Sequence, residues 1–184
     1  MSLGTLPAAG EIGLQAIEGR IGFVDLEAPG GSTFMISAGA DLGQLSPDLG
    51  LEAGIDFWTK GLDEGSDGYG GCNCTWDYSW STIAFIGNVR YDIQTEGSFA
   101  PFLFGGLGFH FWKADADVDC SGCGVEWVDE GYSHSDLEIG FNFGAGADIG
   151  SGEGMMPTFR AGFNSNGGFD YLYIQGGLKF PVGQ

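Results

Sequence analysis

Every second residue of the stretch 136–149, DLEIGFNFGAGADI, is apolar. These residues are Leu137, Ile139, Phe141, Phe143, Ala145, Ala147 and Ile149. The positions between them carry only glycine, asparagine or a carboxylate. Because successive side chains of a β-strand point to opposite faces, one face of this strand is apolar and the other has no large apolar group. The pattern predicts a transmembrane β-barrel, in which lipid covers the apolar face and a crowded polar interior takes the other.

Seven further segments alternate in a similar way and are predicted to be strands. They are residues 12–26, 33–42, 49–60, 80–93, 100–116, 156–164 and 169–182. Eight strands is an even number, as expected for a bacterial single-chain outer-membrane barrel. We therefore expect one all-β domain over residues 1–184, an eight-stranded antiparallel up-and-down transmembrane β-barrel, with residues 1–11 as an N-terminal extension.

Two polar segments, residues 61–79 and 117–135, have no sustained apolar period and are expected to be long external loops. They follow the third and fifth predicted strands, so both leave the barrel at the same end. The turns after the second, fourth and sixth strands are short. Long loops at one end and short turns at the other are typical of outer-membrane barrels.

The chain holds 25 acidic and six basic residues, a net charge of −19, which excludes nucleic-acid binding through a basic patch. No apolar run reaches the length of a spanning helix, which excludes a helical membrane protein. The first residues, MSLGTLPAAGEIG, lack the basic start and apolar core of a secretory signal. We therefore expect a mature sequence, without its signal peptide, that resides in the bacterial outer membrane.

Most basic residues share the inward parity of the predicted strands, and inward carboxylates accompany them. A buried guanidinium group needs a carboxylate partner, because an unpaired charge in a low-dielectric interior is very costly. The sequence therefore predicts an ion-pair network inside the barrel. Its expected members are Glu18, Arg20, Glu52, Asp56, Arg90, Glu138, Asp148 and Arg160.

Glycine-spaced, aromatic-flanked segments such as FRAGFNSNGGFDYLYIQGGLKF and DLEIGFNFGAGADI resemble the small eight-stranded outer-membrane barrels of the outer-membrane protein A, X and W type. The resemblance covers nearly the whole chain. It implies a plugged polar interior, mobile external loops, and a structural, adhesive or small-solute role. One departure is that the chain ends KFPVGQ, without the terminal aromatic residue typical of these barrels; Phe180 is four residues from the end.

Four cysteines, Cys72, Cys74, Cys120 and Cys123, form two close pairs in the predicted loops. Their even number fits an oxidising compartment. A disulfide between Cys72 and Cys74 would be strained, so pairing between the two loops is the simpler arrangement. The spacing also resembles two halves of a zinc site, and free or intermolecular thiols remain as a third possibility.

Three further groups of residues invite a chemical interpretation. Two acidic clusters lack the spacing of a calcium-binding EF-hand and are expected to be solvated. They are Asp115, Asp117 and Asp119, and Asp63, Glu64 and Asp67. We therefore expect no metal and no cofactor. The run 133–136, Ser-His-Ser-Asp, has the residue types of a hydrolase, but consecutive residues do not provide the geometry of a triad. An aromatic girdle at the membrane interface is expected from Trp76, Tyr78, Trp80, Trp112, Trp127 and Tyr132.

We expect a structural or surface-interaction protein with a plugged polar lumen, and no enzyme. An eight-stranded barrel is only wide enough for side chains, so a general diffusion pore is not expected. The expected partners are outer-membrane lipid and, through the long loops, neighbouring barrels or extracellular ligands. Three alternatives remain open: a lipid-modifying enzyme using His134 or His110 with a nearby serine, a soluble lipocalin-type barrel, and a subunit of an ordered surface array or filament.

Overall fold

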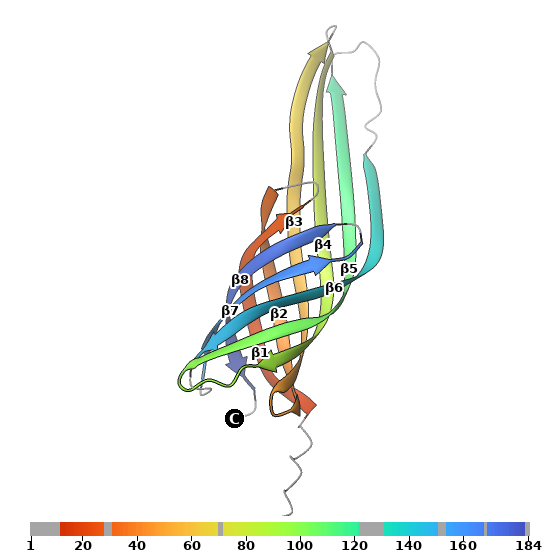
Figure 1. Cartoon of the computed structure of the whole chain (residues 1–184). Coiled ribbons are helices and arrows are strands. Elements are labelled where there is room, and N and C mark those ends of the chain that lie inside the picture. Colours follow the sequence, from red (N-terminus) through yellow and green to blue (C-terminus); the bar gives the residue numbers. More distant parts are fainter. Residues whose placement is uncertain are drawn as a thin grey trace, which may run out of the picture.

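The computed structural model of the chain describes residues 12–27, 31–69, 72–121, 131–150, 154–167 and 169–182; within these ranges the side chains of residues 62–69, 72, 73, 119 and 121 are not described. Eight antiparallel strands form a closed barrel in which each strand pairs with the next and β1 pairs with β8. The strands are β1 (Ile12–Leu26), β2 (Gly31–Ser46), β3 (Leu49–Tyr69), β4 (Cys72–Asp92), β5 (Phe99–Ser121), β6 (Tyr132–Ile149), β7 (Met156–Ser165) and β8 (Asp170–Pro181). The predicted up-and-down barrel is therefore confirmed (Figure 1).

The outer surface of the barrel is an apolar belt. Ile139 and Ile174 are 66% and 69% exposed, although both lie in the middle of strands. The neighbouring inward positions are buried; for example, Asn142 and Gln175 are almost completely covered. Ring closure leaves no unpaired strand edge around the barrel, so the backbone satisfies its own hydrogen bonds as a lipid environment requires.

Inward glycines make room for large side chains in the narrow interior. A Cβ atom added at Gly146 would lie 2.4 Å from Cζ of Phe102, and one added at Gly162 would lie 2.6 Å from the hydroxyl oxygen of Tyr173. Neither distance is compatible with van der Waals packing. The unusual glycine content of the inward positions is therefore a condition for filling this barrel with aromatic rings.

Strands β3, β4 and β5 continue far beyond the rest of the barrel on one side and form a sheet extension (Figure 1). The ladder pairs Tyr69 with Cys72 and Asn73 with Ser121, and β6 joins its base from Tyr132 onward. None of the described segments is a helix long and apolar enough to cross a membrane.

The sheet extension differs from the expectation of long loops at residues 61–79 and 117–135. Residues 61–69, 72–79, 117–121 and 132–135 are paired strands, while residues 70–71 and 122–130 lie outside the described part of the chain. The sequence pattern misses this ladder because its outward positions are polar. Membrane strands are recognised by apolar residues at the outward positions. A ladder held by backbone hydrogen bonds outside the membrane does not need them.

Candidate functional site: the barrel interior and the sheet extension

Arg160 of β7 lies at the centre of a buried ionic cluster. Its two terminal nitrogens are 2.7 and 2.8 Å from the two carboxylate oxygens of Glu52, a bidentate pair between β7 and β3. The Glu18 carboxylate on β1 is 3.2 Å from Arg160 Nη2. All three side chains are almost completely buried. Parallel charge-assisted hydrogen bonds of this kind fix both the position and the plane of the guanidinium group.

Arg90 of β4 extends the cluster towards the end of the barrel away from the sheet extension. Its Nη1 is 2.9 Å from Asp148 Oδ2 and 3.4 Å from Glu52 Oε1, and its Nε donates to Asp92 Oδ1 over 2.7 Å. The guanidinium carbon lies 3.7 Å from the centre of the Phe102 ring. The arginine is thus held by carboxylates at its edge and by an aromatic ring at its face.

Two further basic residues complete the cluster. Arg20 donates to Glu18 and lies 3.8 Å from Asp56, while Lys179 is 2.9 Å from Asp41 and 3.5 Å from Asp148. The remaining space beside Arg20, Asp56 and Arg160 is a cavity of about 10 Å³. A cavity of this size holds about one water molecule.

The structure brings together every residue expected in the ion-pair network except Glu138. Glu138 lies on β6 directly opposite His110, and within the described residues it forms no ion pair. Lys179 and Asp41 belong to the cluster but were not among its expected members. The inward parity of Lys179 and of Asp41 in the sequence was the available signal.

Above the ionic cluster, towards the sheet extension, the interior holds an apolar and aromatic layer beside buried polar side chains such as Thr82 and His110. The buried members of this layer are Val24, Leu26, Met35, Trp58, Phe169 and Tyr171. Trp58 meets Phe169 edge to face, with ring centres 5.5 Å apart. A polar interior was expected, because the prediction rested on the glycines and charged residues of the inward face and gave the inward aromatic residues no separate layer.

Trp80 and Trp112 join this interior layer instead of an aromatic girdle on the outer surface. Their ring centres are 5.3 Å apart, and Trp80 lies 5.0 Å from Phe169. Both residues have inward parity and are half-buried against the aromatic layer. The expected girdle residue Trp127 lies outside the described part of the chain.

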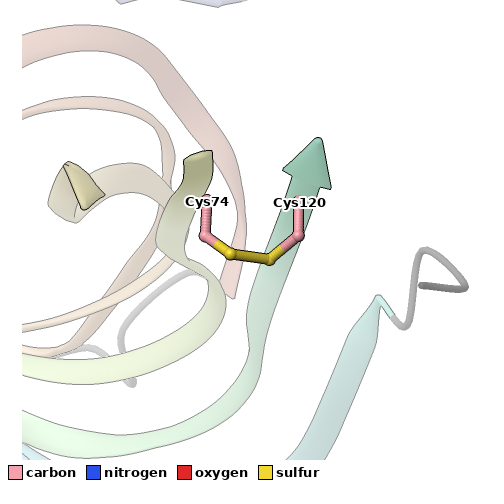
Figure 2. The surroundings of a disulfide bond; sticks show 2 residues. All are labelled: Cys74 and Cys120. Carbon is pink, nitrogen blue, oxygen red and sulfur yellow. A yellow bond between two sulfur atoms is a disulfide. The ribbon is translucent and has the colours of Figure 1, made fainter. Parts of the chain in front are cut away.

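A disulfide between Cys74 and Cys120 joins β4 and β5 near the tip of the sheet extension (Figure 2). The two residues face each other in the ladder, with Cα atoms 4.0 Å apart. This confirms the expected pairing between the two segments for these two cysteines. The Cys72 side chain and Cys123 lie outside the described part of the structure.

The two faces of the sheet extension differ in the side chains that the structure describes. Outward positions carry Asp77 and Asp117, which are paired across the β4–β5 ladder. The other face, continuous with the barrel interior, is called here the inner face. Its exposed large apolar side chains, among the described residues, are Tyr78, Val118 and Tyr132, at 40%, 37% and 66% exposure; His134 and Asp136 of β6 are also exposed on this face. The polarity of the two faces is therefore the reverse of that in the barrel.

The histidines and serines of the expected hydrolase alternative are separated. Ser133 and Ser135 lie on the face of β6 opposite to His134, because neighbouring residues of a strand point to opposite sides. His134 stacks with Tyr132 and contacts Trp112. His110 is fully buried in the barrel beside Tyr171. None of these serines and histidines forms a nucleophile–base pair in the described structure.

No cluster of metal ligands is present among the described residues. Asp115 instead forms an ion pair with Lys113, whose Nζ lies 2.6 Å from Asp115 Oδ1. A hydrogen bond from Lys113 lowers the pKa of Asp115 below its usual value, with a second hydrogen bond from Ser133 acting in the same direction. The side chains of Asp63, Glu64, Asp67 and Asp119 are not described.

Comparison with known proteins identifies the architecture. The family model for the outer membrane protein β-barrel domain matches residues 3–181. Neisserial surface protein A is similar over 96% of this chain and 99% of its own, with 12% sequence identity and a TM-score of 0.54. A major outer membrane protein from Thermus thermophilus has 13% identity over 91% of this chain and 99% of its own, with a TM-score of 0.57.

A third solved structure is that of Ail, the attachment invasion locus protein of Yersinia pestis, in complex with the heparin analogue sucrose octasulfate. It has 8% identity over 92% of this chain and 99% of its own, with a TM-score of 0.52. At these identities the solved structures show the fold. No curated protein matches the chain.

Proposed function

Because this chain belongs to the family of the outer membrane protein β-barrel domain and resides in the bacterial outer membrane, we propose that it is a surface-interaction protein. The barrel is its anchor, and the sheet extension of β3, β4 and β5 is its binding surface on the outside of the cell. The observation that carries the proposal is the exposed aromatic inner face of the sheet extension. The neighbouring barrel proteins, one of which is a surface protein and one an attachment protein by name, are consistent with it.

The contents of the barrel support an anchor with a filled interior. The ionic cluster and the aromatic layer both lie inside the barrel, and the cavity beside the ionic cluster is only about 10 Å³. A lipocalin-type barrel needs an apolar cavity of ligand size, and a diffusion pore needs a water-filled channel. The paired charges of this interior favour neither use.

The inner face of the sheet extension supports a binding role. Beyond the apolar belt the strands have no lipid to cover them, and Tyr78, Val118 and Tyr132 are nevertheless exposed. Exposed apolar patches rimmed by polar residues commonly mark interaction sites. Because the whole chain has a net charge of −19, which attracts basic partners over a distance, the partner we propose is a protein surface with basic and apolar side chains. This differs from the anionic sugar bound by Ail.

Two fluorescent peptides of equal charge test the proposal, one alternating lysine with leucine and the other alternating lysine with serine. Fluorescence polarisation would measure their binding to the full chain in phosphatidylcholine nanodiscs, with empty nanodiscs as background. The protein is expected to prefer the lysine–leucine peptide. The double variant Tyr78→Ser, Tyr132→Ser is expected to bind that peptide about tenfold more weakly, because exposed aromatic anchors dominate such interfaces.

The matched control is Tyr91→Ser, which removes an exposed tyrosine from the outer surface at the opposite end of the barrel. This variant is expected to bind as the unmodified protein does. Equal binding of both peptides, or unchanged binding by the double variant, would show that charge alone attracts the probe and would refute the proposed role of the inner face.

A further inference from the structure

Three rows of cross-strand neighbours cross the outer surface of β4, β5 and β6 at the boundary between barrel and sheet extension. The rows are Ile83–Phe111–Leu137, then Ser81–Lys113–Ser135, then Ser79–Asp115–Ser133. The first row belongs to the apolar belt, whereas the second and third are polar. The outward side chains change from apolar to polar over two residues along each strand. The second row therefore lies at the level of the lipid head groups.

A groove of about 520 Å³ crosses this boundary on the outer surface. Phe57, Ile83, Phe111 and Leu137 line its apolar part. Ser81, Lys113 and Ser135 line its polar end, together with Trp112 and Asp136, whose positions in the ladder have the opposite, inward parity. The groove therefore has the two-part chemistry of a membrane lipid, with hydrocarbon walls below and hydrogen-bond donors above.

Lys113 is the only basic residue on the outer surface at this boundary. The structure describes all six basic residues of the chain. Four of them, Arg20, Arg90, Arg160 and Lys179, are buried in the ionic cluster. Lys60, at the rim, has inward parity and donates to the carbonyl oxygen of Ser32. In a chain with so few cations, the position of Lys113 needs an explanation.

The ion pair with Asp115 leaves Lys113 able to bind another group. Asp115 lies one row further from the membrane, and the Lys113 side chain is still 54% exposed. An ammonium group has three donors, and one carboxylate contact does not use all of them. A ligand that approaches from the membrane side therefore meets the free donors of Lys113 together with the hydroxyl groups of Ser81 and Ser135.

We propose that this groove binds a phosphorylated membrane lipid in the leaflet next to the sheet extension. The phosphate group is placed at Lys113, Ser81 and Ser135, and an acyl chain lies along Phe57, Ile83, Phe111 and Leu137. Charge complementarity selects the anionic head group, and the apolar walls of the groove select a lipid over a free anion. The inference rests on the membrane location of the family, and it is independent of the ligand proposed for the sheet extension.

Native mass spectrometry of the full chain in neutral detergent tests the site with three probes: phosphatidic acid, diacylglycerol with the same chains, and inorganic phosphate. One molecule of phosphatidic acid is expected to remain bound, in preference to diacylglycerol. Lys113→Gln is expected to weaken this binding about fivefold to tenfold, since one lysine near a membrane surface contributes about 1 kcal/mol. Leu137→Ser is expected to weaken it by shortening the apolar wall of the groove.

Lys60→Gln is the matched control, because it removes a lysine from the same rim at a position that does not line the groove. It is expected to leave phosphatidic acid binding unchanged. Heat-modifiable migration on a gel checks that each variant keeps its barrel. Unchanged binding by Lys113→Gln, equal retention of diacylglycerol, or displacement of phosphatidic acid by inorganic phosphate at equal concentration would each overturn the proposed lipid site.

Discussion

Arg160 shows at the level of single residues how this interior is held together. It shares Glu52 with Arg90 and Glu18 with Arg20, so three arginines and their carboxylates form one connected set. Burial of a charge pair is expensive, and the attraction between its members roughly offsets that expense. The set therefore contributes little net stability as a whole, although each member is essential to its partners.

Removal of one charge from the central pair is expected to be far more damaging than removal of both. Arg160→Met leaves Glu52 with only the more distant Arg90 contact, and a buried charge without its main partner costs about 3 to 5 kcal/mol in the free energy of unfolding. The double variant Arg160→Met, Glu52→Leu is expected to lose markedly less. Urea unfolding in detergent, followed by tryptophan fluorescence, measures both.

The Arg160→Met experiment has an internal control in the exposed pair between Lys113 and Asp115. Lys113→Gln is expected to change the free energy of unfolding by about 0 to 1 kcal/mol, as is usual for a surface ion pair. If Arg160→Met is as mild as Lys113→Gln, the ionic cluster is not coupled in the way the geometry indicates.

Residue parity explains which members of the cluster could be predicted from the sequence. Alternation along a strand decides which side chains point inward, so Arg20, Asp56 and Arg160 were identifiable as interior residues. It does not give the height of each residue in the barrel. Glu138 has the correct parity, but the β5–β6 register places it beside His110 and away from the arginines. Register depends on the whole ring of strands, which no single segment contains.

At the level of elements, the sheet extension is the main feature that the sequence pattern did not predict. Its strands are as continuous as those of the barrel, yet their outward residues are polar and their inner face is aromatic. The reversal follows from the solvent: lipid surrounds the barrel strands, whereas water surrounds the extension on its outer side. In the sequence, only the expected cysteine pairing indicated that residues 61–79 and 117–135 lie side by side, and Cys74 and Cys120 do form a disulfide.

The disulfide is expected to stabilise the sheet extension without affecting the barrel. Cys74→Ser combined with Cys120→Ser removes a link between residues 46 positions apart, and such a link typically contributes about 2 to 4 kcal/mol. Amide hydrogen exchange in residues 74–79 and 114–120 is therefore expected to become faster.

Residues 83–90 and 103–110 of the same two strands, inside the barrel, provide the comparison. Their exchange is expected to stay as slow as in the unmodified protein, because ring closure and the ionic cluster hold them. Unchanged exchange in the sheet extension of the double variant would show that backbone pairing alone maintains it.

For the whole molecule, the alternation of apolar and small polar residues was enough to predict a closed eight-stranded barrel with an apolar outer surface. The division of its interior into an ionic cluster and an aromatic layer was not predictable. Trp58 of β3 and Tyr171 of β8 lie on strands far apart in the sequence and come together only when the barrel closes. Sequence periodicity reports the two faces of each strand, whereas the contents of the interior depend on which strands face each other across it.

The arrangement of belt, filled interior and sheet extension can be tested in one measurement on the unmodified protein. Methyl groups of isoleucine, leucine and valine are labelled, and the full chain is placed in nanodiscs. Nuclear magnetic resonance signals are then recorded with a spin label in the lipid chains and, separately, with a water-soluble gadolinium chelate. Each methyl group reports which of the two probes reaches it.

The lipid label is expected to broaden Ile139 and Ile174 of the belt, and the gadolinium chelate is expected to broaden Val118 on the inner face of the sheet extension. Neither probe is expected to reach Val24 in the interior. Broadening of Val118 by the lipid label would place the sheet extension against the membrane. That result would contradict the central claim that a filled barrel presents an aromatic surface to the outside of the cell.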